Sequence, residues 1–261
     1  MSPLWSIARS TFVGIIRDRL SLLLLAFTLL MLALITAMSA GSLHEEARLI
    51  KDVGIFLTSS FAVLSSLFVG AQLLHRELEG RTLYLLLPKP LSRSQFLLGK
   101  YLGMALSSLL LITLMDGALY LLSSSLGVDW DAAMYQALIA CALELLMICA
   151  VSFAFGSFSS PLFAGALSLG FFLVGRFIPE LNQLLEKRVD GAYFIEGVSR
   201  QLLEIARLLI PDLSRYDLTS AAVYDGPLPW AYLGWLALSA ISYSGLALLV
   251  AALLFQRRDL H

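Results

Sequence analysis

The sequence has little charge and little cysteine, and these shortages bound the class of protein. Only 14% of its 261 residues are charged and 59% are hydrophobic, against roughly 25% charged and 45–50% apolar in ordinary globular domains. This composition excludes a soluble globular domain and indicates an integral membrane protein. The two cysteines, Cys141 and Cys149, lie eight positions apart in one apolar run. That spacing corresponds to about 12 Å along a helix, which is too far for a disulfide.

The sequence also lacks the common motifs of nucleotide and metal chemistry. Its nearest approach to the phosphate-binding pattern G-x-x-x-x-G-K-[ST] is Gly99-Lys100, but Ser94 replaces the first glycine and Tyr101 follows the lysine. The segment 44–48, HEEAR, departs from the zinc motif H-E-x-x-H at its last residue. The methionines are scattered, without an outward-facing cluster of Met, His and Cys. We therefore expect no catalytic residue, no metal site and no ATP hydrolysis in this chain.

Six apolar runs predict an all-α membrane protein with six transmembrane helices in a single domain over residues 1–261. The first run, of 21 residues, just crosses a hydrocarbon core of about 30 Å at about 1.5 Å per residue. The runs cover residues 20–40, 53–74, 101–126, 133–155, 162–178 and 230–255. Tight turns are expected at Gly127–Ala132 and at Gly156–Pro161.

Residues 3–19 precede the first run and predict a helix that lies in the membrane surface. Apolar side chains share one broad face of this helix, and polar side chains lie opposite, with Val13 as the exception. The apolar face comprises Leu4, Ile7, Ala8, Phe12, Ile15 and Ile16, and the polar face Ser6, Arg9, Ser10 and Arg17. The alternative is a plain lead-in to the first transmembrane helix.

The longest polar interruption in the first half of the chain is the loop 75–100. It contains five basic residues, Arg76, Arg81, Lys89, Arg93 and Lys100, and an apolar patch at Leu83–Leu87. If the N-terminus is cytoplasmic, the cytoplasmic segments hold ten Lys and Arg against four acids, and the opposite side holds eight against thirteen. The positive-inside rule therefore predicts that both termini and this loop are cytoplasmic.

The segment 179–229, on the predicted outer side, has the pattern of an amphipathic helix. Apolar residues recur at helical spacing with charged residues between them. The apolar positions are Phe194, Ile195, Val198, Leu202, Ile205, Ala206 and Leu209. Pro211 is expected to end this helix, which carries too many charges to be a seventh transmembrane helix.

Two acids, Asp116 and Glu144, lie inside predicted transmembrane helices. An ionised carboxylate at that depth costs on the order of 2.5 kcal/mol or more, so each must be neutral, paired or facing water. They are candidates for lining a translocation path, or for holding helices together by hydrogen bonds. In the fifth run, Gly165, Gly170 and Gly175 predict close packing against another helix.

The loop sequence ELEGRTLYLLLPKPLSRSQFLLGK resembles the cytoplasmic loop of permease subunits of type-2 ABC transporters, the exporter-like group. The closest similarity is to the group that includes the copper-processing permease of nitrous-oxide reductase maturation. LLIPDLSRYDLTSA, at residues 208–221, resembles the stretch before the last transmembrane helix of that family. Many members have glycine directly before the threonine, where this chain has Arg81.

The resemblance implies that the loop forms a coupling helix that docks on a separate ATPase subunit, which binds ATP and Mg. It assigns this contact to Glu77, Glu79, Gly80, Arg81, Thr82, Leu83, Pro90, Ser92, Arg93 and Lys100. It also implies a dimer with a second permease copy or a homologue, in a bacterial-type inner membrane. The other expected partner is the lipid bilayer, and no nucleic acid is expected.

Two other functions stay open. The chain could be a membrane enzyme that acts on lipid, with the segment 179–229 as its active site. Alternatively, it could be a scaffold that couples ATP hydrolysis to a protein at the outer face without transporting a substrate. Binding of an ATPase subunit separates the enzyme from the other two functions, and substrate-stimulated ATP hydrolysis separates the transporter from the scaffold.

Overall fold

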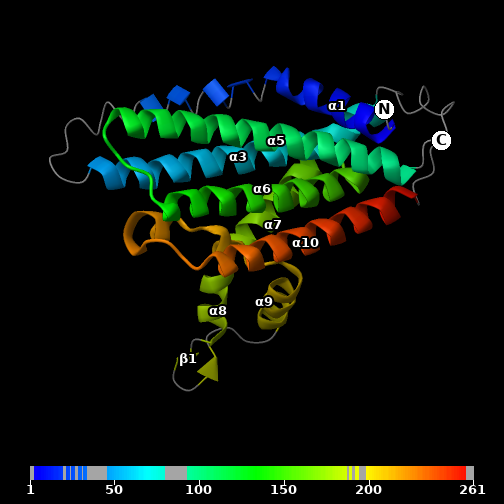
Figure 1. Ribbon diagram of the computed structural model, residues 1–261. Coiled ribbons are helices and arrows are strands. Elements are labelled where there is room, and N and C mark those ends of the chain that lie inside the picture. The colour runs from blue at the N-terminus through cyan, green and yellow to red at the C-terminus, as the bar shows by residue number, and fades with distance from the viewer. Residues whose placement is uncertain are drawn as a thin grey trace.

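The computed structural model describes residues 3–19, eight residues between 22 and 33, and residues 46–79, 93–186, 188–189, 192–193 and 198–256. These parts of the chain are almost entirely helical and form an elongated bundle with a smaller helical part at its side (Figure 1). The all-α prediction is therefore confirmed, apart from one hairpin of two-residue strands.

Four helices are long and apolar enough to cross a membrane, and a bent pair supplies a possible fifth crossing. The four are α3 (Glu46–Glu79), α5 (Arg93–Ser125), α6 (Ala132–Phe158) and α10 (Trp230–Gln256). The bent pair is α7 (Pro161–Arg176) and α8 (Ile178–Glu186), with an angle of 59° between them. The predicted transmembrane helix 20–40 falls largely outside the described residues. The structure therefore establishes a multi-pass helical protein with four or five of the six predicted crossings.

Three helices depart from the predicted bounds. Helix α3 begins at Glu46, seven residues before the predicted transmembrane helix, and ends at Glu79, five residues after its predicted end. Helix α5 begins at Arg93, eight residues before the predicted transmembrane helix, so the loop 75–100 is shorter than expected. Helix α6 continues to Phe158, so the turn predicted at Gly156–Pro161 is reduced to two residues. The backbone N–H of Ser159 donates to the carbonyl of Phe155, and Pro161 starts α7 because its fixed φ suits the first helical position.

Helix α6 is the centre of the bundle and packs against α3, α5, α7 and α10. Of its apolar window, 72% is buried, against 28% for α10. Its sequence explains this position, because it is apolar all round and rich in small residues that let neighbouring helices approach. The small buried residues include Ala133, Ala137, Ala140, Cys141, Ala150, Ala154 and Ser157.

The N-terminal helix α1 (Pro3–Ile16) packs lengthwise on the first turns of α5 (Figure 1). Gly99 lies against Ile7, and a Cβ at Gly103 would meet the carbonyl oxygen of Ala8 at 2.5 Å. One turn further, the Ser107 hydroxyl donates to the carbonyl of Phe12 at 3.4 Å. The two helices therefore run parallel, and α1 lies in a groove on α5 that is formed by the small residues Gly99, Gly103 and Ser107. The predicted apolar face of α1 is confirmed, but in this structure it covers α5.

The chain between α7 and α10 forms several short elements beside the bundle. They are α8, β1 (Arg188–Val189), β2 (Ala192–Tyr193), α9 (Val198–Leu209), the 3-10 helix η1 (Leu213–Tyr216) and the π-helical turn η2 (Ala221–Asp225). The predicted amphipathic helix corresponds to α9, which ends before Pro211 as expected. Helix α8 and the hairpin were not predicted. We call residues 179–229 the cap segment, because they cover one side of the bundle (Figure 1).

The cap segment reaches into the bundle as well as lying beside it. Gly175, in the last turn of α7, is covered by the side chain of Leu213 and the carbonyl of Pro211. The close packing predicted for the fifth apolar run is therefore confirmed at Gly175, although its partner is η1 and no transmembrane helix. A Cβ at Gly170 would meet nothing within 4 Å.

Candidate functional site

The predicted ATPase contact lies at the end of the bundle where α3 ends and α5 begins, which we call the loop end. Glu77 and Glu79 are in the last turn of α3, and Arg93 is the first residue of α5. The two helices lie side by side, so these three positions come together at one end of the molecule (Figure 1). The other predicted contact residues before α5 lie outside the described residues; they are Gly80, Arg81, Thr82, Leu83, Pro90 and Ser92.

Lys100 and Gly99, at the end of the loop motif, lie inside the chain's own packing. Lys100 is 6% exposed, and its Nζ is 5.7 Å from the centre of the Phe96 ring. Gly99 faces α1, as described above. The role of Lys100 in ATPase contact stays a prediction, and its burial favours an indirect role through the position of α1 and α5.

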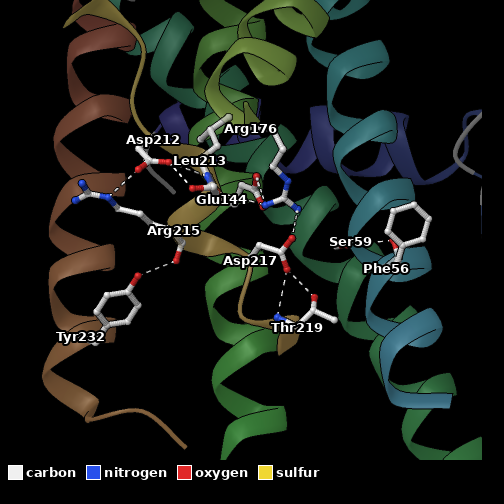
Figure 2. A network of polar contacts seen from close by, with 11 residues as sticks. Phe56, Ser59, Glu144, Arg176, Asp212, Leu213, Arg215, Asp217, Thr219 and Tyr232 are labelled. Atoms are coloured by element: carbon white, nitrogen blue, oxygen red, sulfur yellow. Dashed lines mark hydrogen bonds and ion pairs between the residues drawn. The ribbon is translucent and has the colours of Figure 1, made fainter. Parts of the chain in front are cut away.

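A second polar region lies between α6, α7 and the cap segment, and we call it the polar centre. Glu144, on α6, is 1% exposed, and its Oε1 lies 3.5 Å from Nη1 of Arg176 at the end of α7. Arg176 reaches Asp217 through Nη2 at 3.5 Å and donates from Nη1 to the carbonyl of Leu213. Figure 2 shows these groups converging on the guanidinium. One arginine therefore joins three elements that are distant in sequence.

Local geometry explains why each charge stands where it does. Arg176 is in the last turn of α7, where the helix dipole favours a cation. Asp217 follows η1 and accepts from the backbone N–H and the hydroxyl of Thr219, at 3.2 and 2.6 Å. Glu144 Oε1 has no hydrogen bond among the described residues, so its stabilisation comes from the ion pair with Arg176.

Asp116, the other predicted intramembrane acid, lies on α5, which packs against α6. The Oδ1 atom of Asp116 is buried and has no hydrogen-bond partner among the described residues. Of the two predicted acids, Glu144 is therefore paired with Arg176, and Asp116 offers a buried acceptor.

Hydrogen bonds fix the cap segment at two further points. The Gln136 carboxamide donates to the carbonyl of Leu228 at 2.7 Å and accepts from its N–H at 2.8 Å. The Tyr216 hydroxyl, on η1, donates to the carbonyl of Leu236 at 3.0 Å and lies 2.6 Å from the Ser239 hydroxyl. Gln136 lies two helical turns before Glu144 on α6, about 12 Å at 1.5 Å per residue. The cap segment therefore contacts α6 over that depth.

Arg176, Asp217 and Gln136 were not predicted from the sequence. Arg176 could have been found from the sequence, because it is a cation at the boundary of an apolar run in a chain with intramembrane acids. Asp217 lies within the stretch 208–221 that carries the family resemblance, so that stretch contributes a contact to the polar centre. In the described part of the chain, no group of three or more His, Cys, Asp or Glu is arranged to hold a metal.

The fold and the buried charges define a multi-pass α-helical membrane protein with a polar centre beside its central helix. The sequence model of the family described as "ABC-2 family transporter protein" matches residues 5–260. Because this match covers nearly the whole chain, the protein belongs to the ABC-2 transporter family and is a membrane component of that class. No curated protein matches the chain in a sequence search.

Proposed function

We propose that this chain is the transmembrane subunit of an ATP-driven ABC transporter and that a separate subunit hydrolyses ATP. The observation that carries the proposal is the family match over residues 5–260, together with the multi-helix bundle. A second permease copy or a homologue would complete the translocation path. The similarity of the loop to the exporter-like group supports export, in the subgroup that includes the nitrous-oxide-reductase permease. That similarity does not imply copper as the substrate.

The loop 75–100 is the proposed ATPase contact, and it is well placed to transmit movement. It joins α3 and α5, two helices of 34 and 33 residues, which correspond to about 50 Å each at 1.5 Å per residue. A displacement at the loop end would move both helices along the whole bundle. It would also move α1, because α1 packs closely against Gly99 and Gly103 at the start of α5.

The proposed topology has six transmembrane helices, with residues 20–40 as the first and residues 162–178, which are mostly α7, as the fifth. Both termini and the loop end would face the cytoplasm, and the cap segment would lie at the outer face of a bacterial-type inner membrane. The distribution of Lys and Arg supports this orientation. We propose that the exposed side of α1, which includes Trp5 and Arg9, lies at the cytoplasmic membrane surface.

The contacts of the two intramembrane acids favour different roles. Glu144 is engaged with Arg176 and supports the packing of α6, α7 and η1. Asp116 has a buried oxygen without a partner, so it is the better candidate for the translocation path. Asp116→Asn is expected to impair transport with little change in melting temperature, and Glu144→Gln is expected to leave transport largely intact. Wild-type transport by Asp116→Asn would exclude Asp116 from the path.

The coupling proposal is tested by reversing two charges at the loop end. Glu79→Lys combined with Arg81→Glu should leave the permease inserted, because neither side chain is predicted to lie in lipid. Interface residues near a docking centre often cost more than about 1 kcal/mol when changed, and charge reversal adds repulsion. Pull-down of the ATPase subunit should therefore weaken at least about fivefold, and transport-coupled hydrolysis should fall.

Glu180→Lys, on the exposed surface of α8, is the matched control and should bind the ATPase normally. The melting temperature of the detergent-solubilised permease is measured for every variant. Normal ATPase binding and coupled hydrolysis in the double variant would show that this part of the loop is no docking contact. An ATPase that binds but is never stimulated by any transported substrate would instead favour the scaffold function.

A further inference from the structure

A groove of about 570 Å³ lies between the cap segment and the first half of α10. Its walls come from α8, the end of α9, η1 and α10, and it is partly open to the surroundings. The side chains that decide its chemistry are Asn182, Arg207, Arg215, Tyr216, Trp235 and Tyr243. None of the predicted site residues lines it, so it is separate from the loop end.

One part of the groove carries excess positive charge. Arg215 donates from Nε to Asp212 at 3.0 Å, and its side chain remains 69% exposed. The Asp212 carboxylate is already used, because it also accepts from the backbone N–H and hydroxyl of Ser214. Arg207 has no acid within ion-pair distance among the described residues, and two arginines thus face one acid. Figure 2 shows Arg215 and Asp212 beside α10.

The opposite wall is aromatic and belongs to α10, a helix apolar enough to cross a membrane. Trp235, on α10, is 71% exposed although it lies within a helix that is apolar enough to cross a bilayer. Tyr243 follows two turns later, about 12 Å along the helix. Tyr216, the last residue of η1, reaches α10 through its hydroxyl. Aromatic side chains of this kind collect at the boundary between headgroups and hydrocarbon. The groove therefore combines a cationic part with an aromatic wall that continues along α10.

We infer that this groove binds an anionic phospholipid of the leaflet that the cap segment covers. The phosphate would lie between Arg207 and Arg215, whose guanidinium groups match phosphate oxygens, and an acyl chain would follow Trp235 and Tyr243. Asn182 lines the same groove, and its buried carboxamide oxygen has no hydrogen-bond partner among the described residues. A headgroup with a hydroxyl next to the phosphate, such as phosphoglycerol, would supply the missing donor.

The charge distribution and the shape favour a lipid over a soluble anion. A soluble phosphate would use only the arginines and would leave the aromatic wall without an occupant. A neutral lipid would use the wall and would leave Arg207 without a counter-charge. An anionic phospholipid satisfies both parts, and the binding requires neither ATP nor the ATPase subunit.

The experiment measures quenching of tryptophan fluorescence in nanodiscs that contain a small mole fraction of lipid brominated on its acyl chain. Brominated phosphatidylglycerol is compared with brominated phosphatidylcholine, and the signal of Trp235 is obtained by difference from Trp235→Phe. We expect phosphatidylglycerol to quench Trp235 at least about threefold more effectively, because two charge-assisted contacts are added. This preference should diminish at high salt.

Arg207→Gln combined with Arg215→Gln should abolish the preference. Arg17→Gln combined with Arg19→Gln, an equal charge loss on the exposed surface before the first apolar run, should keep it. Asn182→Leu should reduce the preference for phosphatidylglycerol over phosphatidic acid. If the double variant fails to fold, wild-type protein at low and high salt provides the same comparison. Equal quenching by the two brominated lipids in wild-type protein would overturn the proposal. Competition by inorganic phosphate alone would show a soluble-anion site.

Discussion

The N-terminal helix at the loop end and the cap segment at the side of the bundle are held in place by different chemistry. At the loop end, α1 is seated on α5 by close contact with Gly99 and Gly103, and one hydrogen bond from Ser107. At the cap segment, the contacts to α6, α7 and α10 are an ion-pair centre around Arg176 and hydrogen bonds from Gln136 and Tyr216. The α1–α5 junction therefore depends on the small volume of the side chains between the helices. The junction of the cap segment depends on charge and hydrogen bonding.

This difference follows from what each junction must do in a membrane. Lipid is as apolar as a leucine side chain, so helices gain little from simple hydrophobic burial and associate through close packing or polar contacts. Two regular helices such as α1 and α5 can pack closely along a row of small residues. The cap segment changes direction repeatedly, so its free backbone groups must find polar partners. Each junction should therefore fail under a different kind of substitution.

The largest effect is expected from Arg176→Met, which removes the cation of the polar centre. Glu144 is 1% exposed and would lose its partner, Asp217 would lose a counter-charge, and the Leu213 carbonyl would lose a donor. Removal of one member of a buried ion pair costs about 3–5 kcal/mol. We expect a strongly lowered melting temperature of the solubilised protein and proteolysis of the cap segment before the bundle.

Glu144→Gln in the same background tests the cause of that loss. The Gln amide replaces the carboxyl that Arg176→Met leaves unpaired, so the double variant should recover part of the lost melting temperature. A double-mutant cycle should give a coupling energy of about 1 kcal/mol or more. Additive effects of the two substitutions would show that the ion pair is not what holds the cap segment.

The next effect is expected from Gly103→Ala, at the α1–α5 junction. Its new Cβ would lie 2.5 Å from the carbonyl oxygen of Ala8, a backbone atom that cannot rotate away. Overpacking of this kind costs about 1–3 kcal/mol. Gly117→Ala is the matched control on the same helix, because a Cβ there meets nothing within 4 Å. A cysteine pair between α1 and α5, followed by crosslinking, should show weakened contact only in Gly103→Ala. Equal melting temperatures for the two variants would contradict the volume-dependent junction.

The smallest effect is expected from Tyr216→Phe, which removes one hydroxyl from the cap segment. The hydroxyl donates to the Leu236 carbonyl and lies 2.6 Å from Ser239, and a net loss of about 1 kcal/mol is typical for such a hydrogen bond. Tyr135→Phe, at a side chain that is 47% exposed, should leave the melting temperature unchanged. A Tyr216→Phe protein as stable as wild type would show that apolar packing alone holds η1 on α10.

The class of protein and most of its helices can be predicted from the amino-acid sequence. Hydropathy predicts α3, α5, α6 and α10, because a transmembrane helix needs about twenty consecutive apolar residues and these produce an unmistakable local signal. The first turns of α3 and α5 were not predicted, since they begin seven and eight residues before the apolar runs. The periodicity of α9 and its end before Pro211 are equally local. The apolar face of α1 was also predicted, since it depends only on the helical period of 3.6 residues.

The contacts of those helix faces and charged side chains depend on the tertiary structure and could not be predicted. Nothing local in the sequence pairs Glu144 with Arg176, which is 32 positions later, or adds Asp217 from a segment that was predicted as outer surface. The bend between α7 and α8 lies inside one predicted apolar run, and the packing of α1 on α5 requires two distant rows of residues to match. Such contacts depend on which helices become neighbours. Hydropathy and periodicity report the environment that each residue needs and do not specify the partner that supplies it.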